Sequence, residues 1–561
     1  MSGSISWNEA VAQVTGRGSP FELVEGEVDG QKLLVFKNLS PSIRTIFDSA
    51  RARGDETFLV YEDERLSFSE VMVRVDALAA TMVDHYGVSP GDRVAIGMRN
   101  YPEFIIGFAA ATSIGAIAVC LNAWWTAEEM EYGLKDSGTK LLLADRERVD
   151  RAVSLLARSD LRAIAVRSEG ELPRGSDHWV DVVQKGAAMP EVEITPDMDA
   201  MILYTSGTTG HPKGAVSTHR AVLSALMSFG ARAIVSRIME PPTEQQADPT
   251  SFILVVPLFH VTGLIPVMLS CFSGGFKLVM MYKWNPDRAL ELIERERITQ
   301  FVGVPTMSWD LLESPDFATR DTSSLLSVGG GGAPAPPELV RRVDEGFAKG
   351  KPGIGYGMTE TCAYGPQNAG ADYIRKPRSA GRSLPSMQVK VADEDGHELP
   401  RGEVGEISFR GPNLIRGYWN KPEATAETIV DGWLRSGDIG RMDEEGFIFV
   451  EDRAKDMVLR AGENVYCAEV EAAIYQHSAV YEAAVFGVPH DRLGEEVAAA
   501  IHPKPGTKID VDELQEFLRQ HIAPFKIPRI VEIHAEQLPR NAAGKILKRL
   551  LRDEWVAKSD R

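Results

Sequence analysis

The most informative stretch of the sequence is Ala200-Met-Ile-Leu-Tyr-Thr-Ser-Gly-Thr-Thr-Gly-His-Pro-Lys-Gly-Ala215. In it, an apolar run leads into a segment rich in hydroxyl side chains and glycines. A short apolar run bounded by turn residues is typical of a buried strand. Glycines let backbone N–H groups converge on an anion, while hydroxyls and Lys213 add donors and positive charge. His211 and Pro212 separate Gly210 from Lys213, so the spacing is not that of a Walker A loop. The stretch predicts a phosphate-binding loop of another kind.

Further short runs rich in strand-forming residues lie on both sides of this stretch, and helical patterns separate them. They begin at Arg93, Lys140, Phe252 and Thr299. Continuous apolar strands that alternate with helices indicate parallel sheets covered on both faces. The sequence therefore predicts an α/β protein.

The pattern changes after about residue 380, where short strands are separated by Asp/Gly turns. These strands begin at Gln388, Gly405 and Gly446. They indicate antiparallel hairpins or a small barrel. From about Asp456 to the end, helix and strand signals resume in a segment of small-domain size. We expect a large N-terminal domain of parallel or mixed sheets flanked by helices, with a small β-barrel-like subdomain, and a small α+β C-terminal domain.

Composition excludes several classes of protein. The chain has 561 residues, enough for two to four compact units. Its net charge of −19 opposes nonspecific attraction to nucleic acids, so we expect no nucleic-acid partner. The four cysteines lie far apart and form no CxxC pair, which argues against a zinc knuckle or a disulfide framework. A reducing cytoplasm fits, and residues 1–30 lack the apolar core of a signal peptide.

One uncharged stretch, Phe104 to Ala127, is long enough to cross a bilayer. Gly115 divides it into a helix-like half and a short β-like run, Ala116 to Leu121. This punctuation favours a buried helix-turn-strand over a membrane span. We therefore expect no integral membrane span, and either a monomer or a homodimer.

Four more segments carry polar residues. They are Gly353-Ile-Gly-Tyr-Gly-Met-Thr-Glu360, Trp433-Leu-Arg-Ser-Gly-Asp-Ile-Gly440, the charged segment from Glu451 to Glu471, and Pro539-Arg-Asn-Ala-Ala-Gly-Lys-Ile-Leu-Lys548. The first lacks the final glycine and the long following helix of a dinucleotide-binding fingerprint. Taken singly, the four are typical of an exposed carboxylate, an ordinary turn, a solvated charge run and a solubilising terminal lysine. The occurrence of all four segments in this order along one chain is what indicates a function.

In that order the segments resemble the adenylate-forming superfamily of acyl-CoA synthetases, coumarate-CoA ligases, luciferases and peptide-synthetase adenylation domains. The resemblance covers roughly residues 40–555. It implies an ATP-dependent carboxylic acid:CoA ligase, which forms an acyl adenylate and then a thioester. The implied cofactors and substrates are ATP, Mg²⁺, coenzyme A and a small carboxylic acid.

The resemblance also implies a set of site residues. Tyr356 would place its ring on adenine, and Asp438 would accept hydrogen bonds from the ribose hydroxyls. The implied catalytic residues are Lys545, Thr359, Glu360 and His260, and the implied metal ligands are Glu360 and Thr205. The implied nucleotide and CoA contacts are Thr205, Ser206, Gly207, Thr208, Thr209, Gly210, Lys213, Lys283, Gly331, Gly355, Tyr356, Gly357, Asp438, Arg453, Lys455 and Gly462.

The acid site is expected where Pro257-Leu-Phe-His-Val-Thr-Gly263 meets Val328-Gly-Gly-Gly-Gly-Ala-Pro334. His260 is the polar member of the first segment. Four consecutive glycines in the second remove every side chain, and from this we hypothesise a roomy slot for a long or bulky acyl group. Fatty, aryl and steroid side-chain acids all remain open, and we favour medium or long aliphatic acids.

The resemblance implies a division into an adenylation core (residues 1–451), a hinge (452–455) and a mobile C-terminal domain (456–561). Rotation about the hinge would exchange a Lys545 face for a Gly462 face between the two half-reactions. Leu459 and Cys467 depart from a lysine and a proline that relatives carry near the CoA face. One alternative is therefore a ligase that loads the phosphopantetheine of a carrier protein. A non-catalytic nucleotide-binding protein is the second alternative.

Overall fold

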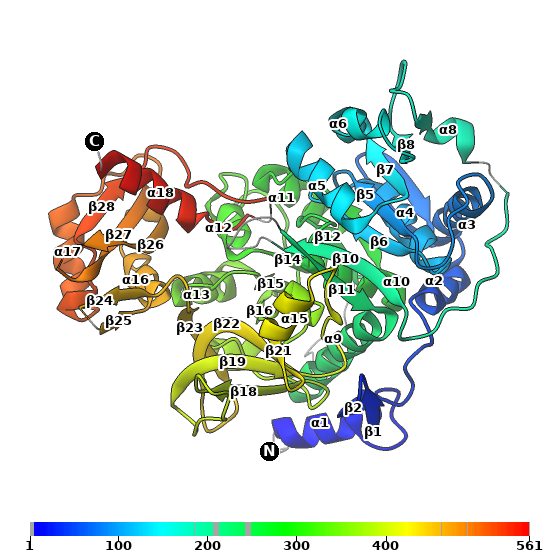
Figure 1. Ribbon diagram of the computed structural model, residues 1–561. Coiled ribbons are helices and arrows are strands. Elements are labelled where there is room, and N and C mark those ends of the chain that lie inside the picture. The colour runs from blue at the N-terminus through cyan, green and yellow to red at the C-terminus, as the bar shows by residue number, and fades with distance from the viewer. Residues whose placement is uncertain are drawn as a thin grey trace.

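The computed structural model describes residues 5–183, 186–205, 212–241, 248–461, 463–490, 492–542 and 544–559. Figure 1 shows a large lobe, blue to yellow, and a small lobe in orange and red at one side. The large lobe contains two eight-stranded sheets and a five-stranded sheet, and the small lobe contains another five-stranded sheet. A short helix, α1 (Trp7–Thr15), and the hairpin of β1 (Leu23–Val28) and β2 (Gln31–Phe36) precede them.

The first large sheet contains the strand that was predicted before the loop. Its order is β20–β11–β10–β6–β5–β7–β8–β9, and β10, β6, β5, β7, β8 and β9 run parallel. The strands are β5 (Arg93–Gly97), β6 (Ile117–Cys120), β7 (Leu141–Asp145), β8 (Arg162–Val166), β9 (Ser176–His178), β10 (Asp199–Thr205), β11 (Lys213–Thr218) and β20 (Gly417–Tyr418). The predicted parallel sheet is confirmed, with the β10–β11 turn at one of its ends.

The second large sheet has the order β17–β16–β15–β14–β12–β13–β3–β4. Its six central strands, from β16 to β3, run parallel. The strands are β3 (Thr57–Tyr61), β4 (Glu64–Ser67), β12 (Ser251–Leu254), β13 (Lys277–Met280), β14 (Gln300–Gly303), β15 (Ser327–Gly331), β16 (Lys351–Gly355) and β17 (Gln367–Ala369). This sheet brings the glycine-rich β15 next to β16, which leads into the Tyr356 segment.

The helices of the large lobe are mostly buried against these sheets. The uncharged stretch from Phe104 forms the buried helix α4 (Pro102–Ser113), a turn at Gly115 and strand β6, as predicted. Within the described part of the chain, α9 (His219–Met239) is long and apolar enough to cross a bilayer by length and composition. Half of its apolar window is buried inside the fold, which is the burial of a core helix.

The predicted antiparallel region is also confirmed. It consists of β18 (Gln388–Ala392), β19 (Val404–Arg410), β21 (Ile429–Val430), β22 (Trp433–Met442) and β23 (Ile448–Arg453). Each neighbouring pair is antiparallel, and the β22–β23 register places Asp438 opposite Arg453. Residues 454–457 then lead to β24 of the small lobe.

The small lobe has the predicted α+β composition. Its strands are β24 (Val458–Arg460), β25 (Glu463–Val465), β26 (Val480–His490), β27 (Gly494–Pro503) and β28 (Ile530–Ile533). Its helices are α16 (Cys467–Ile474), α17 (Val511–Arg519) and α18 (Lys548–Ser559). Apolar side chains from both faces of its sheet form two small cores that are separate from those of the large lobe. The lobe therefore has the internal packing of an independent unit.

Candidate active site

The β10–β11 hairpin fixes both ends of the predicted phosphate loop. Thr205 pairs with Lys213 across the hairpin, and the Thr205 hydroxyl donates a hydrogen bond to the Lys213 carbonyl at 3.3 Å. Tyr204 anchors the strand from the side, because its hydroxyl donates to Asp136 Oδ2 at 2.8 Å. The loop residues themselves, Ser206, Gly207, Thr208, Thr209, Gly210 and His211, lie outside the described residues.

A buried carboxylate lies beside this hairpin. The Tyr418 hydroxyl donates to Glu360 Oε1 at 2.8 Å, and the Lys213 ammonium lies 4.4 Å from the centre of the Tyr418 ring. Glu360 is only 6% exposed. Burial raises the pKa of Glu360, while Tyr418 and the positive charge of Lys213 oppose that rise. Sequence reasoning missed Tyr418, because nothing in Gly417-Tyr-Trp419 indicates a site.

The backbone around Thr359 and Glu360 is tightly constrained. A Cβ atom at Gly357 would lie 2.3 Å from the Ala363 carbonyl oxygen, so only glycine fits there. Cys362 and Ala363 both adopt left-handed backbone angles, with φ of 52° and 64°. Such angles cost on the order of 1 kcal/mol per non-glycine residue and persist where the surroundings hold them. The segment therefore holds Glu360 in a fixed position before any ligand binds.

Three of the predicted nucleotide contacts lie together. The Tyr356 hydroxyl donates to Asp438 Oδ2 at 2.6 Å, and Arg453 Nε lies 3.3 Å from Asp438 Oδ1. The Tyr356 ring packs against Phe409 with centroids 5.5 Å apart. Burial, reinforced by the Asp438 charge, raises the pKa of Tyr356 and keeps its hydroxyl protonated. An aromatic face and a carboxylate thus share one site, although they are 82 residues apart in the sequence.

The small lobe brings Lys545 to the same place. Burial, together with the nearby charge of Arg453, lowers the pKa of Lys545 to about 8, and the charges of Asp456 and Asp438 oppose the shift. A Cβ atom at the preceding Gly544 would lie 3.0 Å from Val304 Cγ2, so this loop touches the large lobe. Lys545 therefore lies close enough to Arg453 and Asp438 for their charges to act on it.

The segments that were predicted to line the acid site contain a neutral histidine and the glycine-rich strand β15, which pairs with β16. Burial lowers the pKa of His260 to about 4, so its imidazole is neutral at pH 7. Its Nδ1 accepts from the Thr262 N–H at 3.3 Å, which places the imidazole proton on Nε2. A Cβ atom at Gly331 would lie 3.2 Å from the Gly355 carbonyl oxygen. A Cβ atom at Gly330 would have its nearest neighbour 3.6 Å away, so Gly330 has more space around it than Gly331.

Two expected contacts lie on the exterior. Lys455 and Lys283 are both exposed, and Gly462 lies outside the described residues. Next to Lys283, Tyr282 and Trp124 both lie under the Arg99 guanidinium, at 5.5 and 4.9 Å from their ring centres. Lys283 therefore follows directly after a residue of an aromatic and cationic cluster. Sequence reasoning missed Arg99, because an arginine between apolar runs is usually only a solvated residue.

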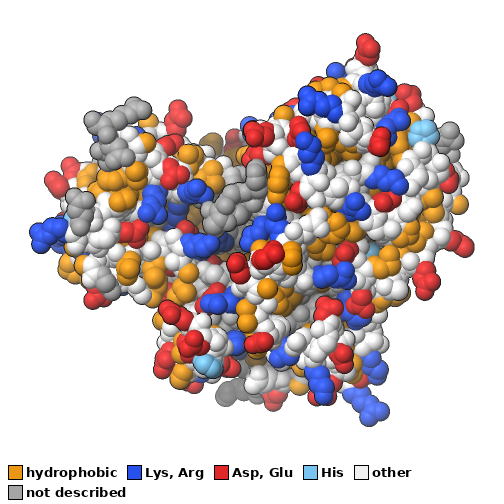
Figure 2. Space-filling view, in the orientation of Figure 1, with side chains coloured by type: hydrophobic (Ala, Val, Ile, Leu, Met, Phe, Trp, Pro, Cys, Tyr) orange, Lys and Arg blue, Asp and Glu red, His pale blue; other side chains and the backbone are white. Residues whose placement is uncertain are grey.

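Basic side chains lie at the junction of the lobes, although the net charge of the chain is negative. Figure 2 shows several Lys and Arg side chains beside the groove where the small lobe meets the large lobe, together with some Asp and Glu side chains. A local positive field attracts an anionic ligand even on a protein with a net charge of −19.

Comparison with known proteins places these features in a family. Residues 46–419 match the family described as AMP-binding enzyme, and residues 469–545 match the AMP-binding enzyme C-terminal domain. A long-chain-fatty-acid–CoA ligase of Bacillus subtilis is 34% identical over 542 residues, with 90% of this chain and 93% of that protein covered. A feruloyl-CoA synthase of Amycolatopsis sp is 36% identical over 500 residues, with 89% and 96% covered. The structure of o-succinylbenzoate CoA synthetase from Bacillus subtilis, in complex with its acyl-adenylate intermediate, has a TM-score of 0.76 at 29% identity, covering 92% of this chain and 98% of that one.

Proposed function

The chain belongs to the family of AMP-binding enzymes, and we propose that this AMP-forming acid–CoA ligase activates a bulky hydrophobic acid, of medium or long chain length. The observation that carries the proposal is the convergence of Tyr356, Asp438 and Arg453 with Lys545, which comes from the other lobe. An aromatic ring, a carboxylate and two cations are the groups that a nucleotide needs for its base, its ribose and its phosphates.

In the first half-reaction the acid attacks the α-phosphorus of ATP and releases pyrophosphate. Negative charge builds on the phosphoryl oxygens during this step, and the protein stabilises it by placing positive charge there in advance. Lys545 and Lys213 supply that charge. Tyr356 and Asp438 hold the adenosine, and Thr359 lies in the constrained segment that faces the α-phosphate.

The residues present fit a magnesium ion. Glu360 offers a buried carboxylate whose direct side-chain donor, Tyr418, is neutral, and Thr205 offers a hydroxyl oxygen near the loop. Hard oxygen donors of this kind suit Mg²⁺, which binds through few protein ligands together with phosphates. The chemistry that Mg²⁺ supplies when bound is neutralisation of phosphate charge. Glu360 and Thr205 would hold it.

In the second half-reaction a thiol attacks the acyl carbon of the adenylate and AMP leaves, a step in which the charge of Lys545 is no longer needed. The separate cores of the two lobes support a rotation of residues 456–561 against residues 1–451 about a hinge at 452–455. Gly462 would then line the pantetheine path, and Lys283 would contact CoA. Lys455 would belong to the hinge itself.

The acid is assigned from chemistry and from the relatives. Two of the relatives named above are a long-chain-fatty-acid–CoA ligase and a feruloyl-CoA synthase, and long-chain fatty and feruloyl groups share a hydrophobic body. A neutral His260 suits such a pocket better than a cation would, because an uncompensated charge there would be costly to bury. A chain lying along Gly330 and Gly331 would meet backbone instead of side chains. Substitution of Gly330 by valine should then shorten the longest acid accepted.

We propose the cytoplasm as the setting of the protein. The four cysteines are free and buried, which supports a reducing cytoplasm. We expect a monomer or a homodimer.

One assay separates this function from its alternatives. Pyrophosphate release is measured across a panel of aliphatic, aryl and steroid side-chain acids, with and without CoA. We expect release with hydrophobic acids and free acyl-CoA as the product. Release of pyrophosphate without any acyl-CoA would favour a carrier-protein ligase, and no release with any acid would leave only a nucleotide-binding protein.

A further inference from the structure

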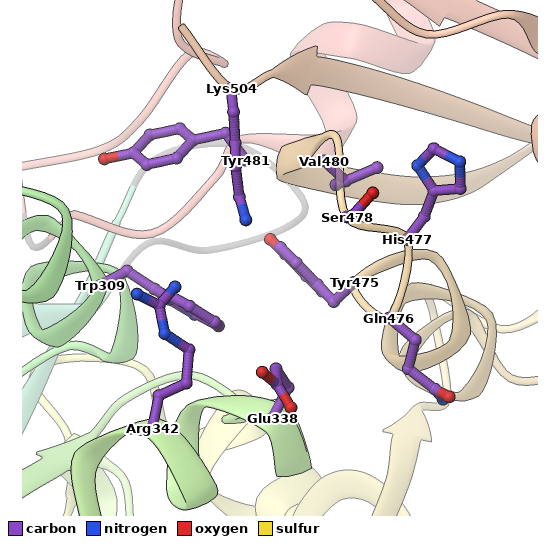
Figure 3. Close-up of a pocket in the computed structure, with 10 residues that line it drawn as sticks. All are labelled: Trp309, Glu338, Arg342, Tyr475, Gln476, His477, Ser478, Val480, Tyr481 and Lys504. Atoms are coloured by element: carbon purple, nitrogen blue, oxygen red, sulfur yellow. The ribbon is translucent and has the colours of Figure 1, made fainter. Parts of the chain in front are cut away.

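The two lobes meet at helix α12 (Pro305–Glu313), and part of this contact is open. A cavity of about 430 Å³ lies between the lobes. Figure 3 shows it between the large lobe, with helix α13 (Pro337–Gly346), and the small lobe. Its lining includes Trp309, Glu338 and Arg342 from the large lobe and Tyr475, Tyr481 and Lys504 from the small lobe. Because this part of the contact is not closely packed, a direct bond between the lobes carries more weight in setting their orientation.

Tyr481 makes such a bond at the edge of the cavity. Its hydroxyl, which points away from the cavity centre in Figure 3, donates to Asp310 Oδ1 at 2.5 Å. The other carboxylate oxygen, Asp310 Oδ2, accepts from Trp284 Nε1 at 2.8 Å. The Trp284 ring packs against the buried Phe301, with centroids 6.0 Å apart. Trp284 therefore fixes the Asp310 carboxylate on the large lobe, and Tyr481 reaches it from the small lobe.

The residue after Tyr481 holds the loop that carries Lys545. Tyr481 lies at an irregularity in the β26–β27 register, between Val480 and Glu482, and Glu482 follows it in the paired part of β26. Glu482 is 2% exposed, and its Oε1 accepts from Arg540 Nη2 at 2.6 Å. Arg540 Nη1 in turn donates to the Gly544 carbonyl at 2.7 Å. Hydrogen bonds and the backbone of β26 therefore connect Asp310 to Gly544, the residue before Lys545.

The same helix receives the Lys545 loop directly. Val304, the residue before the first turn of α12, is the one that Gly544 approaches. Asp310 lies later in α12, so the loop and Tyr481 dock at two separate points on one helix. Two contacts on one rigid helix restrict the angle between the two lobes more than a single contact does.

We propose that Asp310 and Tyr481 are positioning residues for adenylate formation: their hydrogen bond docks β26 on α12 and thereby sets Lys545 at the nucleotide. The inference rests on the proposed function. The bond has to break when the small lobe rotates for thioester formation, so it serves only the first half-reaction. A bond from a hydroxyl to a carboxylate is strong enough to bias the lobes and weak enough to open during turnover.

The test substitutes Tyr481→Phe and measures the two half-reactions separately. Acid-dependent exchange of pyrophosphate into ATP reports the first, and acyl-CoA formation from added acyl adenylate and CoA reports the second. We expect the first to fall about tenfold, the effect of losing one charge-assisted hydrogen bond. The second should stay at the wild-type rate, a split that general destabilisation of the lobe does not produce.

Tyr475→Phe is the matched control. Tyr475 lines the same cavity, but its hydroxyl bonds to the Ala483 backbone within its own lobe. The Tyr475→Phe substitution should leave the ratio of the rates of the two half-reactions unchanged. Asp310→Ala should reproduce the loss, and adding Tyr481→Phe to it should change little, because both act through one bond.

The outcomes separate the inference from the function it rests on. No exchange by the wild-type protein with any acid would overturn the proposed function, and the inference with it. Normal exchange by the wild type together with wild-type exchange by Tyr481→Phe would overturn the inference alone. Equal loss in both half-reactions of Tyr481→Phe would do the same.

Discussion

The two sides of the site are built differently. On the large lobe, Glu360 and Asp438 are buried and already hydrogen-bonded to Tyr418 and Tyr356. On the small lobe, Lys545 sits on a loop that meets the large lobe at Val304, and a cavity separates other parts of the two lobes. The first arrangement suits groups that hold a nucleotide through both half-reactions. The second suits a group that is needed once and then withdrawn.

The sharpest test of the small-lobe side is Arg540→Met. This change leaves the Glu482 carboxylate, with a side chain 3% exposed, without its ionic partner. Loss of one member of a buried pair costs about 3–5 kcal/mol, so the small lobe should lose most of its stability while the large lobe keeps its own. Hydrogen exchange would show early opening of β26 and β27 and unchanged protection in β5 and β7.

Arg519→Met is the control for that change. Its pair with Glu516 is more than half exposed on both sides, so the expected loss is at most about 1 kcal/mol. Equal effects of the two substitutions would contradict the assignment of Glu482 and Arg540 as the clamp of the Lys545 loop.

Tyr418→Phe tests the large-lobe side. Removal of the hydroxyl leaves buried Glu360 without this donor, which should cost about 1–3 kcal/mol in the free energy of unfolding of the large lobe. The concentration of Mg²⁺ needed for half-maximal adenylation should also change, because Glu360 loses the group that orients it. Denaturant unfolding and a magnesium titration measure the two effects. An unchanged magnesium requirement would separate Glu360 from the metal.

The pH dependence gives a smaller and graded effect. With a pKa of about 8, Lys545 is mostly protonated at pH 7 and loses its charge as pH rises through 8. The kcat/KM of adenylation should therefore fall up to about tenfold per pH unit above 8, while thioester formation from added acyl adenylate does not follow that curve. Lys545→Arg should remove the decline, because arginine keeps its charge. A decline that persists in Lys545→Arg would assign it to another group.

Local patterns predicted the elements, whereas the nucleotide side of the site was implied by the family resemblance. The run that begins at Arg93 became β5 (Arg93–Gly97), because an apolar strand is specified by its own residues. Tyr356 and Asp438 were reached through motifs that keep their spacing. Asp310 and Tyr481 were not predicted, since their contact joins residues 171 positions apart and depends on how the lobes dock. No local pattern records that docking.

The hinge and the loop residues stay predictions. The expected hinge begins at Asp452, yet Asp452 and Arg453 still pair with β22, and residues 454–457 make the connection. Strand pairing of this kind depends on the partner strand, which the charge pattern of the segment did not indicate.

The most direct test of the division between the lobes is Lys545→Ala assayed in both half-reactions. Loss of one preorganised charge at the phosphoryl oxygens costs about 3 kcal/mol, so acid-dependent pyrophosphate exchange should fall by a hundredfold or more. Formation of acyl-CoA from added acyl adenylate should stay within about twofold of the wild-type rate, since the lysine has left the site by then. A comparable loss in both half-reactions, or in neither, would contradict the account.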